Sequence, residues 1–301
     1  MDRLTAMELF VRVVETGSFS AVAREMDMTQ PTVSKQLAGL EARLKTRLLN
    51  RSTRQLSLTE AGSSYYEACK RILDGVREAE GNLGKLQGQL AGTLRLNTGI
   101  ALGEIFVAPL AIKFQSLHPE VEIDLQLQDR YVDLVEEGID VAVRVGKLTD
   151  STLVARRLGR TRRVAVATPG YLKKFGTPKV PQDLASHNCL LYSYLSTGNE
   201  WIFQGPEGEI RVKVSGSFRA NNGDAIGQAV QADLGVAVAP EWMVHEAIAS
   251  GRVKVVLPDF APTPVEINAV FTSARHVSAK VRAFIEFLQA EARDHPALRG
   301  T

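Results

Sequence analysis

Residues 29–41, with the sequence TQPTVSKQLAGLE, constrain the fold more than any other stretch of this chain. Thr29 can cap a helix with its hydroxyl group, and Pro31 falls in the first turn, where its missing N–H group costs nothing. Apolar residues then recur at spacings of four, three and four, which predicts a helix with one buried stripe. The stripe consists of Val33, Leu37, Leu40 and Leu44.

The opposite face of this helix carries short polar groups, one cation and small residues. A helix that enters the major groove of DNA needs this arrangement, because its first turns reach the base edges and small residues allow a close approach. An ordinary surface helix is the alternative, and Gly39 argues mildly against it, since a mid-helix Gly costs roughly 1 kcal/mol relative to Ala. We expect DNA contacts from Gln30, Pro31, Thr32, Ser34 and Lys35.

Two shorter helices are predicted before this one. An apolar stripe near the N-terminus ends at Thr16 and Gly17, and Ser18 can cap a second helix that runs to about Met26. Two helices joined by a tight turn, the second with a polar outer face, are typical of a helix-turn-helix. The first stripe consists of Leu4, Met7, Phe10, Val11 and Val14.

A short basic hairpin is predicted after these helices. Residues 50–53 indicate a turn, and Leu56 and Leu58 alternate with polar residues as in a strand. Six cations stand against Glu41 alone in residues 35–54, an excess that can follow a phosphate backbone. Cations also favour helix C-termini, which is the alternative explanation. The cations are Lys35, Arg43, Lys45, Arg47, Arg51 and Arg54, of which we assign Arg51 and Arg54 to phosphates or to the minor groove.

A long helix is predicted from about residue 60. Its apolar residues alternate at spacings of four and three over more than three heptads, which is typical of a coiled coil and therefore of dimerisation. The alternative is packing against the next domain of the same chain, and Gly92 marks the expected boundary. The repeat consists of Tyr65, Cys69, Ile72, Val76, Ala79, Leu83, Leu86 and Leu90.

The N-terminal region resembles the signature of LysR-type transcriptional regulators. The similarity runs through Ser34, Leu40-Glu41, Leu48, Arg51, Arg54 and Leu58-Thr59-Glu60-Ala61-Gly62. The resemblance implies a winged helix-turn-helix that binds double-stranded DNA at an interrupted palindrome. It also implies a homodimer that assembles into a homotetramer, a small-molecule effector, and RNA polymerase as a further partner.

In the remaining residues strand and helix patterns alternate, which predicts a parallel sheet. The pattern resembles the α/β effector domain of the same family, which has two Rossmann-like lobes and the fold of type II periplasmic binding proteins. The expected organisation is a DNA-binding domain at 1–59, a dimerisation helix at 60–91 and an effector domain at 92–301. One lobe would span 92–163 and 267–301, and the other 164–266.

Ligands of such folds collect at the carboxyl ends of strands and at helix N-termini. Arg144 would suit an anionic effector, unless it forms an ion pair with Asp140 or Asp133. Asp129 would instead repel an acid, so the charge of the effector stays open. The candidate effector residues are Thr98, Gly99, Ile100, Asp129, Arg144, Gly146, Asn221 and Asn222.

A run of five arginines without a neighbouring acidic residue falls where the first crossover between the lobes is expected. It consists of Arg156, Arg157, Arg160, Arg162 and Arg163. A solvated strand face is the favoured interpretation, and a subunit contact or a second anion site are the alternatives.

Other function classes find little support in the sequence. The net charge is +2, so nucleic-acid binding must come from a local patch. The five histidines lack metal-ligand spacing, no nucleotide-binding glycine motif or nucleophile elbow occurs, and Ser193 and Cys189 have no identifiable base. We therefore expect no enzyme, metal or cofactor. An intrachain disulfide switch in the effector domain is also excluded, because Cys189 is its only cysteine.

The sequence also bears on where the protein acts. Neither a signal peptide nor a stretch that approaches a membrane span is recognised, and two distant cysteines fit a reducing compartment, so we expect a cytoplasmic protein without a membrane partner. Two alternatives stay open. One is a constitutive DNA-binding protein without an effector, and the other is an enzyme or solute binder with a DNA-binding appendage.

Overall fold

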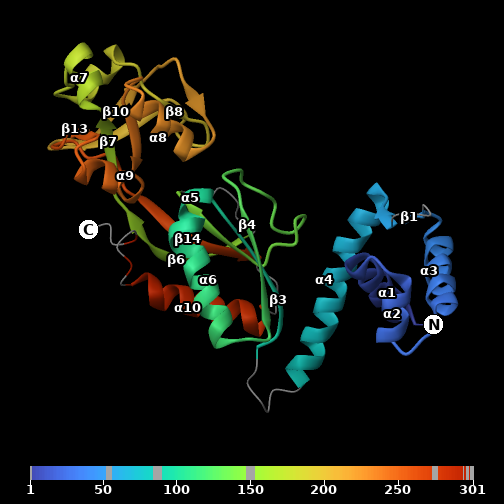
Figure 1. Cartoon of the computed structure of the whole chain (residues 1–301). Helices are drawn as coiled ribbons and strands as arrows, with labels where there is room; N and C mark the ends of the chain where they lie inside the picture. The colour runs from blue at the N-terminus through green and yellow to red at the C-terminus, as the bar shows by residue number, and fades with distance from the viewer. Residues whose placement is uncertain are drawn as a thin grey trace. The chain divides into compact units, whose positions relative to one another are not determined.

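The computed structural model describes residues 2–51, 56–83, 90–146, 153–272 and 277–293, together with His295 and Leu298; the side chains of Arg51 and of residues 77–83 are not described. The chain forms two compact units, Met1–Gly92 and Thr93–Thr301 (Figure 1). Each unit has its own hydrophobic core, so each is described in turn.

The N-terminal unit begins with the three predicted helices, α1 (Arg3–Thr16), α2 (Phe19–Glu25) and α3 (Gln30–Leu44). Gly17 ends α1 in the left-handed conformation, with φ 64°. The Ser18 hydroxyl accepts a hydrogen bond from the N–H of Ala21, and the Thr29 hydroxyl accepts one from Thr32. The caps predicted for α2 and α3 are therefore confirmed.

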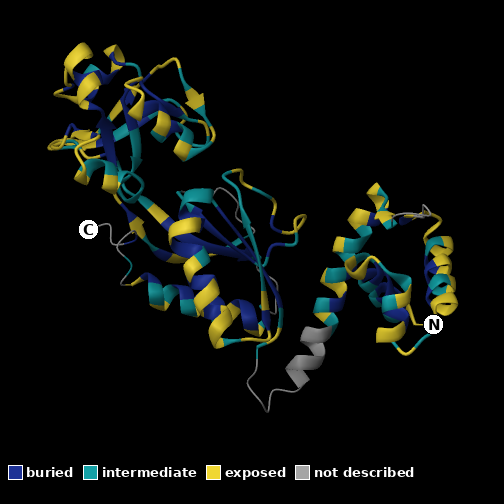
Figure 2. Cartoon of the chain, viewed as in Figure 1, coloured by how far each residue is buried: buried dark blue, intermediate teal, exposed yellow. Residues whose placement is uncertain are grey.

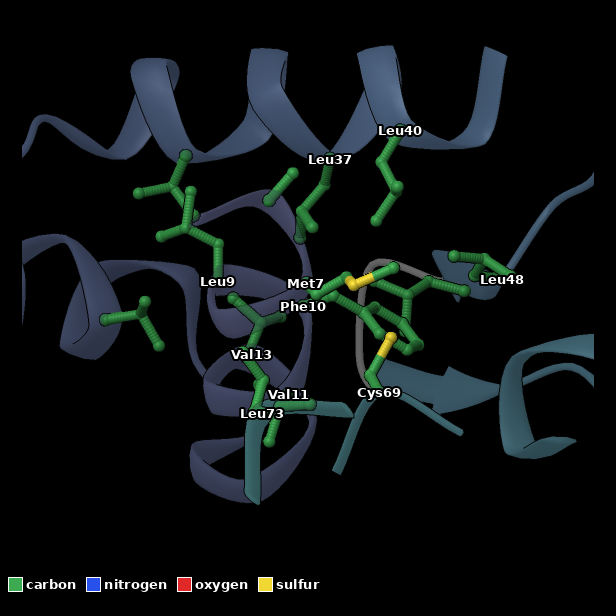
Figure 3. Packing of buried hydrophobic residues seen from close by; sticks show 14 of the residues in the cluster. Met7, Leu9, Phe10, Val11, Val13, Leu37, Leu40, Leu48, Cys69 and Leu73 are labelled. Atoms are coloured by element: carbon green, nitrogen blue, oxygen red, sulfur yellow. The ribbon is translucent and has the colours of Figure 1, made fainter. Parts of the chain in front are cut away.

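The core of this unit lies between α1 and α3, where Phe10, Val33, Leu37 and Leu40 are buried (Figure 3). Leu44 is 36% exposed, so its predicted place in the buried stripe is wrong. The helix ends there because Lys45 turns into the left-handed region, and the next core positions are filled by Leu48 and Leu49.

The hairpin pairs β1 (Leu49–Arg51) with β2 (Leu56–Leu58) in antiparallel register. Asn50 and Arg51, which were predicted in the turn, belong to β1 because they pair with Ser57 and Leu56. Thr53 and Arg54 lie outside the described residues. The strands join the start of α4 through Thr59, whose hydroxyl donates to the Arg47 carbonyl over 2.7 Å.

The long helix α4 (Glu60–Leu83) packs its first half against α1. Gly62 passes so close to Leu48, the residue before β1, that a Cβ atom would lie 2.0 Å from the Leu48 carbonyl oxygen. Cys69 and Leu73 are buried in the core of the same unit, whereas Ile72 is 43% exposed. The predicted repeat is thus divided: its first members support the core and Ile72 faces outward. The side chains of Ala79 and Leu83, and all of Leu86, lie outside the description.

The C-terminal unit contains a five-stranded sheet in the order β4-β3-β5-β14-β6. The strands are β3 (Gly92–Thr98), β4 (Val121–Leu127), β5 (Val141–Val145), β6 (Leu153–Thr161) and β14 (Val265–Thr272). β3 and β5 are parallel, but β14 runs antiparallel to both β5 and β6. The expectation of a parallel sheet is therefore wrong for β14, which follows the second lobe in the chain and returns through the first in the opposite direction.

Helices cover the first lobe. They are α5 (Ile100–Leu102), η1 (Gly103–Val107), α6 (Ala108–Leu117) and α10 (Ala279–Ala292), and the rings of Phe114 and Phe284 meet 5.1 Å apart. The predicted helix at 131–137 is wrong, since residues 131–133 have no regular structure and residues 134–138 form a turn. The Asp133 carboxylate accepts the N–H groups of Val135 and Glu136, which favours a turn over a helix.

The second lobe is built around β7 (Arg163–Ala167), which lies between β12 (Ala237–Pro240) and β13 (Lys254–Val256). The strand predicted over residues 212–218 is wrong after Lys213, where β10 ends. α7, η2, β8, β11, α9 and β13 were not predicted. The other elements are α7 (Pro169–Phe175), η2 (Pro181–Ser186), β8 (Leu191–Tyr192), β9 (Glu200–Gly205), β10 (Gly208–Lys213), β11 (Arg219–Ala220), α8 (Gly223–Gln231) and α9 (Glu241–Ala249).

One helical stretch of the described residues, Ile100–Leu117, is long and apolar enough to cross a membrane by length and composition, contrary to the sequence expectation. Phe106, Leu110 and Phe114 of this stretch are buried within the first lobe (Figure 2). One side of this stretch is therefore buried, as in a helix that packs on the core of its own domain.

Candidate DNA-binding surface and ligand cavity

The outer face of α3 is open along its whole length. Gln30, Pro31, Thr32 and Lys35 are exposed and Ser34 is partly exposed (Figure 2). The hydroxyl groups of Thr29 and Thr32 are hydrogen-bonded to each other over 2.7 Å, which holds the Thr32 side chain at the first turn. The five α3 residues predicted to contact DNA therefore lie on or beside one solvent-facing surface.

Gly39 has no packing role in the described part of the chain. A Cβ atom built on it would meet nothing within 4 Å, and Ala38 beside it is also exposed. Small residues on this face are therefore not required by the protein's own core. They leave the helix backbone accessible to another molecule at these positions.

Glu41 is the one acidic residue in the basic stretch from Lys35 to Arg54, and it is bound to the backbone of the following turn. Its carboxylate accepts the N–H groups of Leu48 and Leu49, at 2.8 and 3.2 Å, and so ties down the turn that leads into β1. The exposed cations around it are Lys35, Arg43, Lys45 and Arg47. Arg51 ends β1 with an undescribed side chain, and Arg54 lies outside the described residues, so their roles stay predictions.

The C-terminal unit contains a cavity of about 220 Å³ between its two lobes. Of the eight candidate effector residues, four line it: Gly99, Asp129, Arg144 and Gly146. Thr98 is fully buried under η1, and Ile100, Asn221 and Asn222 are not part of the lining. The carboxyl ends of β3 and β5 thus reach the cavity, as the position of these loops predicts.

Asp129 connects the two lobes. One of its carboxylate oxygens accepts the Ile100 N–H, and the other accepts the side-chain amide of Asn222, each over 3.0 Å. Asn222 also caps α8, because its amide oxygen accepts the N–H of Ala225. Both oxygens of Asp129 are thus engaged by protein donors, which reduces the repulsion expected between this residue and an acidic ligand.

Arg144 is 7% exposed and is not neutralised by either of the carboxylates proposed in the sequence analysis. Its guanidinium lies 5.2 Å from the centre of the Tyr131 ring, and its Nη2 has no hydrogen-bond partner among the described residues. Asp133 and Asp140 accept backbone N–H groups instead. Burial lowers the pKa of Arg144, and the nearby Tyr131 raises it.

Arg163 also lines the cavity, which the sequence did not distinguish from the rest of the arginine run. Its Nε donates to the Thr263 carbonyl over 2.8 Å, and burial lowers its pKa to about 10. The sequence signal that could have distinguished Arg163 from the other arginines is its place at the start of the buried strand β7.

The other arginines of the run fit the predicted solvated face. Arg156, Arg157 and Arg160 are exposed on β6, an edge strand. The expectation of no acidic residue nearby is wrong in space, because Arg157 lies 3.6 Å from Glu266 and Arg162 lies 3.7 Å from Glu241. Both acids are distant in sequence.

Aromatic residues were missed entirely as part of this site. Tyr131, Tyr192, Tyr194, Trp201 and Trp242 line the cavity, together with aliphatic side chains from both lobes. They lie on separate elements, so no local sequence pattern brings them together. Burial raises the pKa of Tyr192 well above its ordinary value, which keeps its phenol protonated.

Cys189 is not arranged as a nucleophile. Its thiol is buried, its Sγ lies 3.5 Å from the Leu184 carbonyl oxygen, and burial raises its pKa to about 12. The neighbouring His187 faces the Tyr171 hydroxyl at 3.2 Å, and burial lowers the pKa of its ring. A buried thiol with a raised pKa is inert at neutral pH.

The comparisons with known proteins cover both units. Residues 4–63 match the family model described as "Bacterial regulatory helix-turn-helix protein, lysR family", and residues 87–293 match "LysR substrate binding domain". The chain is 36% identical to the HTH-type transcriptional activator AaeR of Escherichia coli (strain K12), over 96% of this chain and 93% of that protein. It is 35% identical to the HTH-type transcriptional regulator CrgA of Neisseria meningitidis serogroup C (strain 8013), over 95% of both proteins.

Solved structures give the same result. The structure of CrgA from Neisseria meningitidis, described as a LysR-type transcriptional regulator, matches with a TM-score of 0.60 and 34% identity, over 96% of this chain and 98% of that one. The full-length structure of the Vibrio cholerae virulence activator AphB matches with a TM-score of 0.59 and 28% identity, over 96% and 99%. With an exposed helix-turn-helix, a two-lobed ligand-binding unit and relatives that align along nearly its whole length, the chain belongs to the LysR family of transcriptional regulators.

Proposed function

We propose that the outer face of α3 enters the major groove with Gln30, Pro31, Thr32, Ser34 and Lys35 at the groove, and that Thr32 and Ser34 contact base edges there. The observation that supports this assignment best is the open face itself: polar first turns, a Gly and an Ala behind them, and no partner from the protein's own core. Lys35, Arg51 and Arg54 supply phosphate contacts, whose contribution to affinity depends on salt.

The second part of the proposal is assembly through symmetric copies. Ile72 of α4 is 43% exposed, and α6 exposes Ile112 at 69% and Leu117 at 59%. Apolar side chains of this size on two helix faces support contacts with further copies of the chain. A homodimer through α4 and a homotetramer through the C-terminal units would present paired helix-turn-helix units to an interrupted palindrome.

The cavity of the C-terminal unit is the proposed effector site, with Gly99, Asp129, Arg144 and Gly146 in its wall. An effector changes transcription only if it binds one quaternary state more tightly than the other. The regulated partner at the promoter is RNA polymerase, and the protein acts in the cytoplasm, where the bacterial chromosome lies. We propose no catalytic role and no resident metal or cofactor.

The deciding experiment is a pull-down of fragmented genomic DNA by the purified full-length protein, followed by sequencing. We expect enrichment of a few promoter fragments that share an interrupted palindrome. Uniform, salt-sensitive recovery without a common motif would contradict the proposal, because phosphate contacts alone produce that pattern.

A constitutive DNA-binding protein without an effector is the main alternative. Arg144 is buried in the cavity wall without an ion pair to any described carboxylate, which argues for a ligand, because an uncompensated buried charge is costly to keep for folding alone. A thermal-shift screen of the full chain separates the two, since a ligand that binds only the folded state raises its stability. Turnover of any stabilising compound would favour the enzyme alternative.

A further inference from the structure

The described wall of the cavity carries more positive than negative side chains. Among the described residues, its two cationic wall residues are Arg144 of β5 in the first lobe and Arg163, which begins β7 of the second lobe. Asp129 is the one acid among the described wall residues, and both of its oxygens already accept hydrogen bonds from Ile100 and Asn222. Charged side chains removed from water are normally paired, so the cavity retains a positive charge that no described residue neutralises.

The unpartnered hydrogen-bonding groups of the wall also favour an anionic ligand. Among the described residues, Nη2 of Arg144 and the indole Nε1 of Trp242 are buried without a hydrogen-bond partner. Both groups are donors only. In contrast, the Tyr131 hydroxyl is already used, because it donates to the Val145 carbonyl over 3.0 Å. Because Nη2 of Arg144 and Nε1 of Trp242 are shielded from water, they act on the cavity through their positive potential, which favours a ligand that carries acceptors.

The remaining wall limits the shape of the ligand. Tyr131, Tyr192, Trp201 and Trp242 contribute ring surfaces, and Tyr192 and Tyr194 meet edge to face with ring centres 5.9 Å apart. The cavity holds about 220 Å³. A dry cavity of roughly 150 Å³ accepts benzene, so this one has room for a single ring with a small charged substituent. Aromatic walls favour a planar ring over an aliphatic chain.

We infer that the effector is a small aromatic carboxylate, with its carboxylate against the Arg144 guanidinium and its ring between the tyrosines and tryptophans of the two lobes. The inference rests on the proposed function, because it names the chemical class of ligand for the cavity assigned to the effector. Arg163 adds positive potential from the opposite lobe, so the anion favours the arrangement in which the lobes enclose it. A phosphate group fits less well, because the described residues of the wall include no lysine and are mostly apolar.

Benzoate and its neutral isostere benzamide are the probes that test this inference, with inorganic phosphate as a second anion. Thermal unfolding and calorimetric titration use the full-length protein. We expect benzoate to bind and raise the unfolding temperature, and benzamide of equal shape to bind at least tenfold more weakly. The Arg144→Gln variant is expected to lose benzoate affinity by roughly tenfold or more, which is typical of a lost charge-assisted hydrogen bond. Its matched control is Arg156→Gln, an exposed arginine on β6 of the same sheet, which should bind as the wild type does.

The folding of the variant is checked without ligand. Because Gln removes an uncompensated charge, the unliganded Arg144→Gln protein should unfold at a temperature no lower than that of the wild type. Equal binding of benzoate and benzamide, binding of phosphate alone, or no binding of any probe would each overturn the inference. Promoter enrichment in the DNA pull-down would leave the proposed function intact in those cases. Benzoate binding without any enriched DNA motif would support the inferred ligand class and contradict the proposed function.

Discussion

The outer face of α3 and the cavity of the C-terminal unit are the two surfaces assigned to recognition, and they are built in opposite ways. The α3 surface comes from residues 30–39 of one helix and is open to solvent. The cavity collects residues from Gly99 to Val265 and encloses two arginines among aromatic side chains. The first surface depends on local sequence and an intact core beneath it, whereas the second depends on tertiary packing and on the contact between two lobes.

The largest expected effect tests whether these surfaces depend on separate cores. Phe10 is fully buried beneath α3, so Phe10→Ala should destabilise the N-terminal unit by about 3–5 kcal/mol and abolish DNA binding. Benzoate binding should persist. Phe114→Ala, in the core of the C-terminal unit, is the matched variant and should have the reverse pattern. Denaturant unfolding and titrations on each variant measure both properties. Loss of both activities in both variants would contradict independent cores.

Within the α3 surface, base and phosphate contacts should separate. Ser34→Ala should reduce discrimination between the palindrome and random DNA by about 1–3 kcal/mol, the range of a good base contact. Lys35→Ala should weaken binding to all sequences and lower the salt slope by about one unit. Binding is measured by titrating labelled duplexes at several salt concentrations. Equal losses on specific and random DNA for Ser34→Ala would contradict the base-contact assignment.

The α3 surface, which depends on local sequence, was predicted better than the cavity, which depends on tertiary packing. The helix-turn-helix was predictable because caps at Ser18 and Thr29 and the stripe from Val33 to Leu40 are local signals. Leu44 was misplaced because periodicity does not show where the helix ends. The antiparallel direction of β14 was missed since strand patterns carry no direction.

The cavity was predictable only at its strand ends. Gly99, Asp129, Arg144 and Gly146 follow strands, so the general position of ligands in α/β folds led to them. The ring residues and Arg163 lie on distant elements whose meeting is a tertiary property. The pairing of Asp129 with Asn222 was also invisible, because 93 positions separate them.

The hydrogen bond between Asn222 and Asp129, which joins the two lobes, can be replaced by a charge repulsion. Asn222→Asp keeps a good helix cap for α8 but places a second carboxylate against Asp129. The variant should be less stable than the wild type by about 1–3 kcal/mol at pH 7. Repulsion raises the pKa of one carboxyl in the folded state, so the deficit should shrink as the pH falls toward and below the ordinary range of Asp. Urea unfolding at pH 7 and pH 4 measures it, with Asn222→Ser as the control that keeps a cap without repulsion. A deficit that does not change with pH would contradict the mechanism.

The smallest expected effect contrasts the unpaired Arg144 with the paired Arg12 of the N-terminal unit. Arg12 Nε and Nη2 contact the two carboxylate oxygens of Glu25 at 2.7 and 2.9 Å, and hydrogen bonding from Arg12 holds the pKa of Glu25 below its ordinary value of 4.5. An acid with a lowered folded pKa stabilises the fold above its unfolded pKa, and this contribution is lost as the pH falls through the folded value.

The wild type should therefore exceed Glu25→Gln in unfolding temperature at pH 7, by a small margin because the pair is solvent-exposed. The margin should shrink as the pH falls below 4.5 and vanish once the pH is below the lowered pKa of Glu25 in the folded protein. High salt should also reduce it, since mobile ions screen exposed charges. The same salt should leave the unliganded stability of Arg144→Gln relative to the wild type nearly unchanged, because burial shields that guanidinium from ions. Equal salt sensitivity at the two arginines would mean that the cavity is as hydrated as the protein surface, and the case for an anion in its wall would lose its energetic basis.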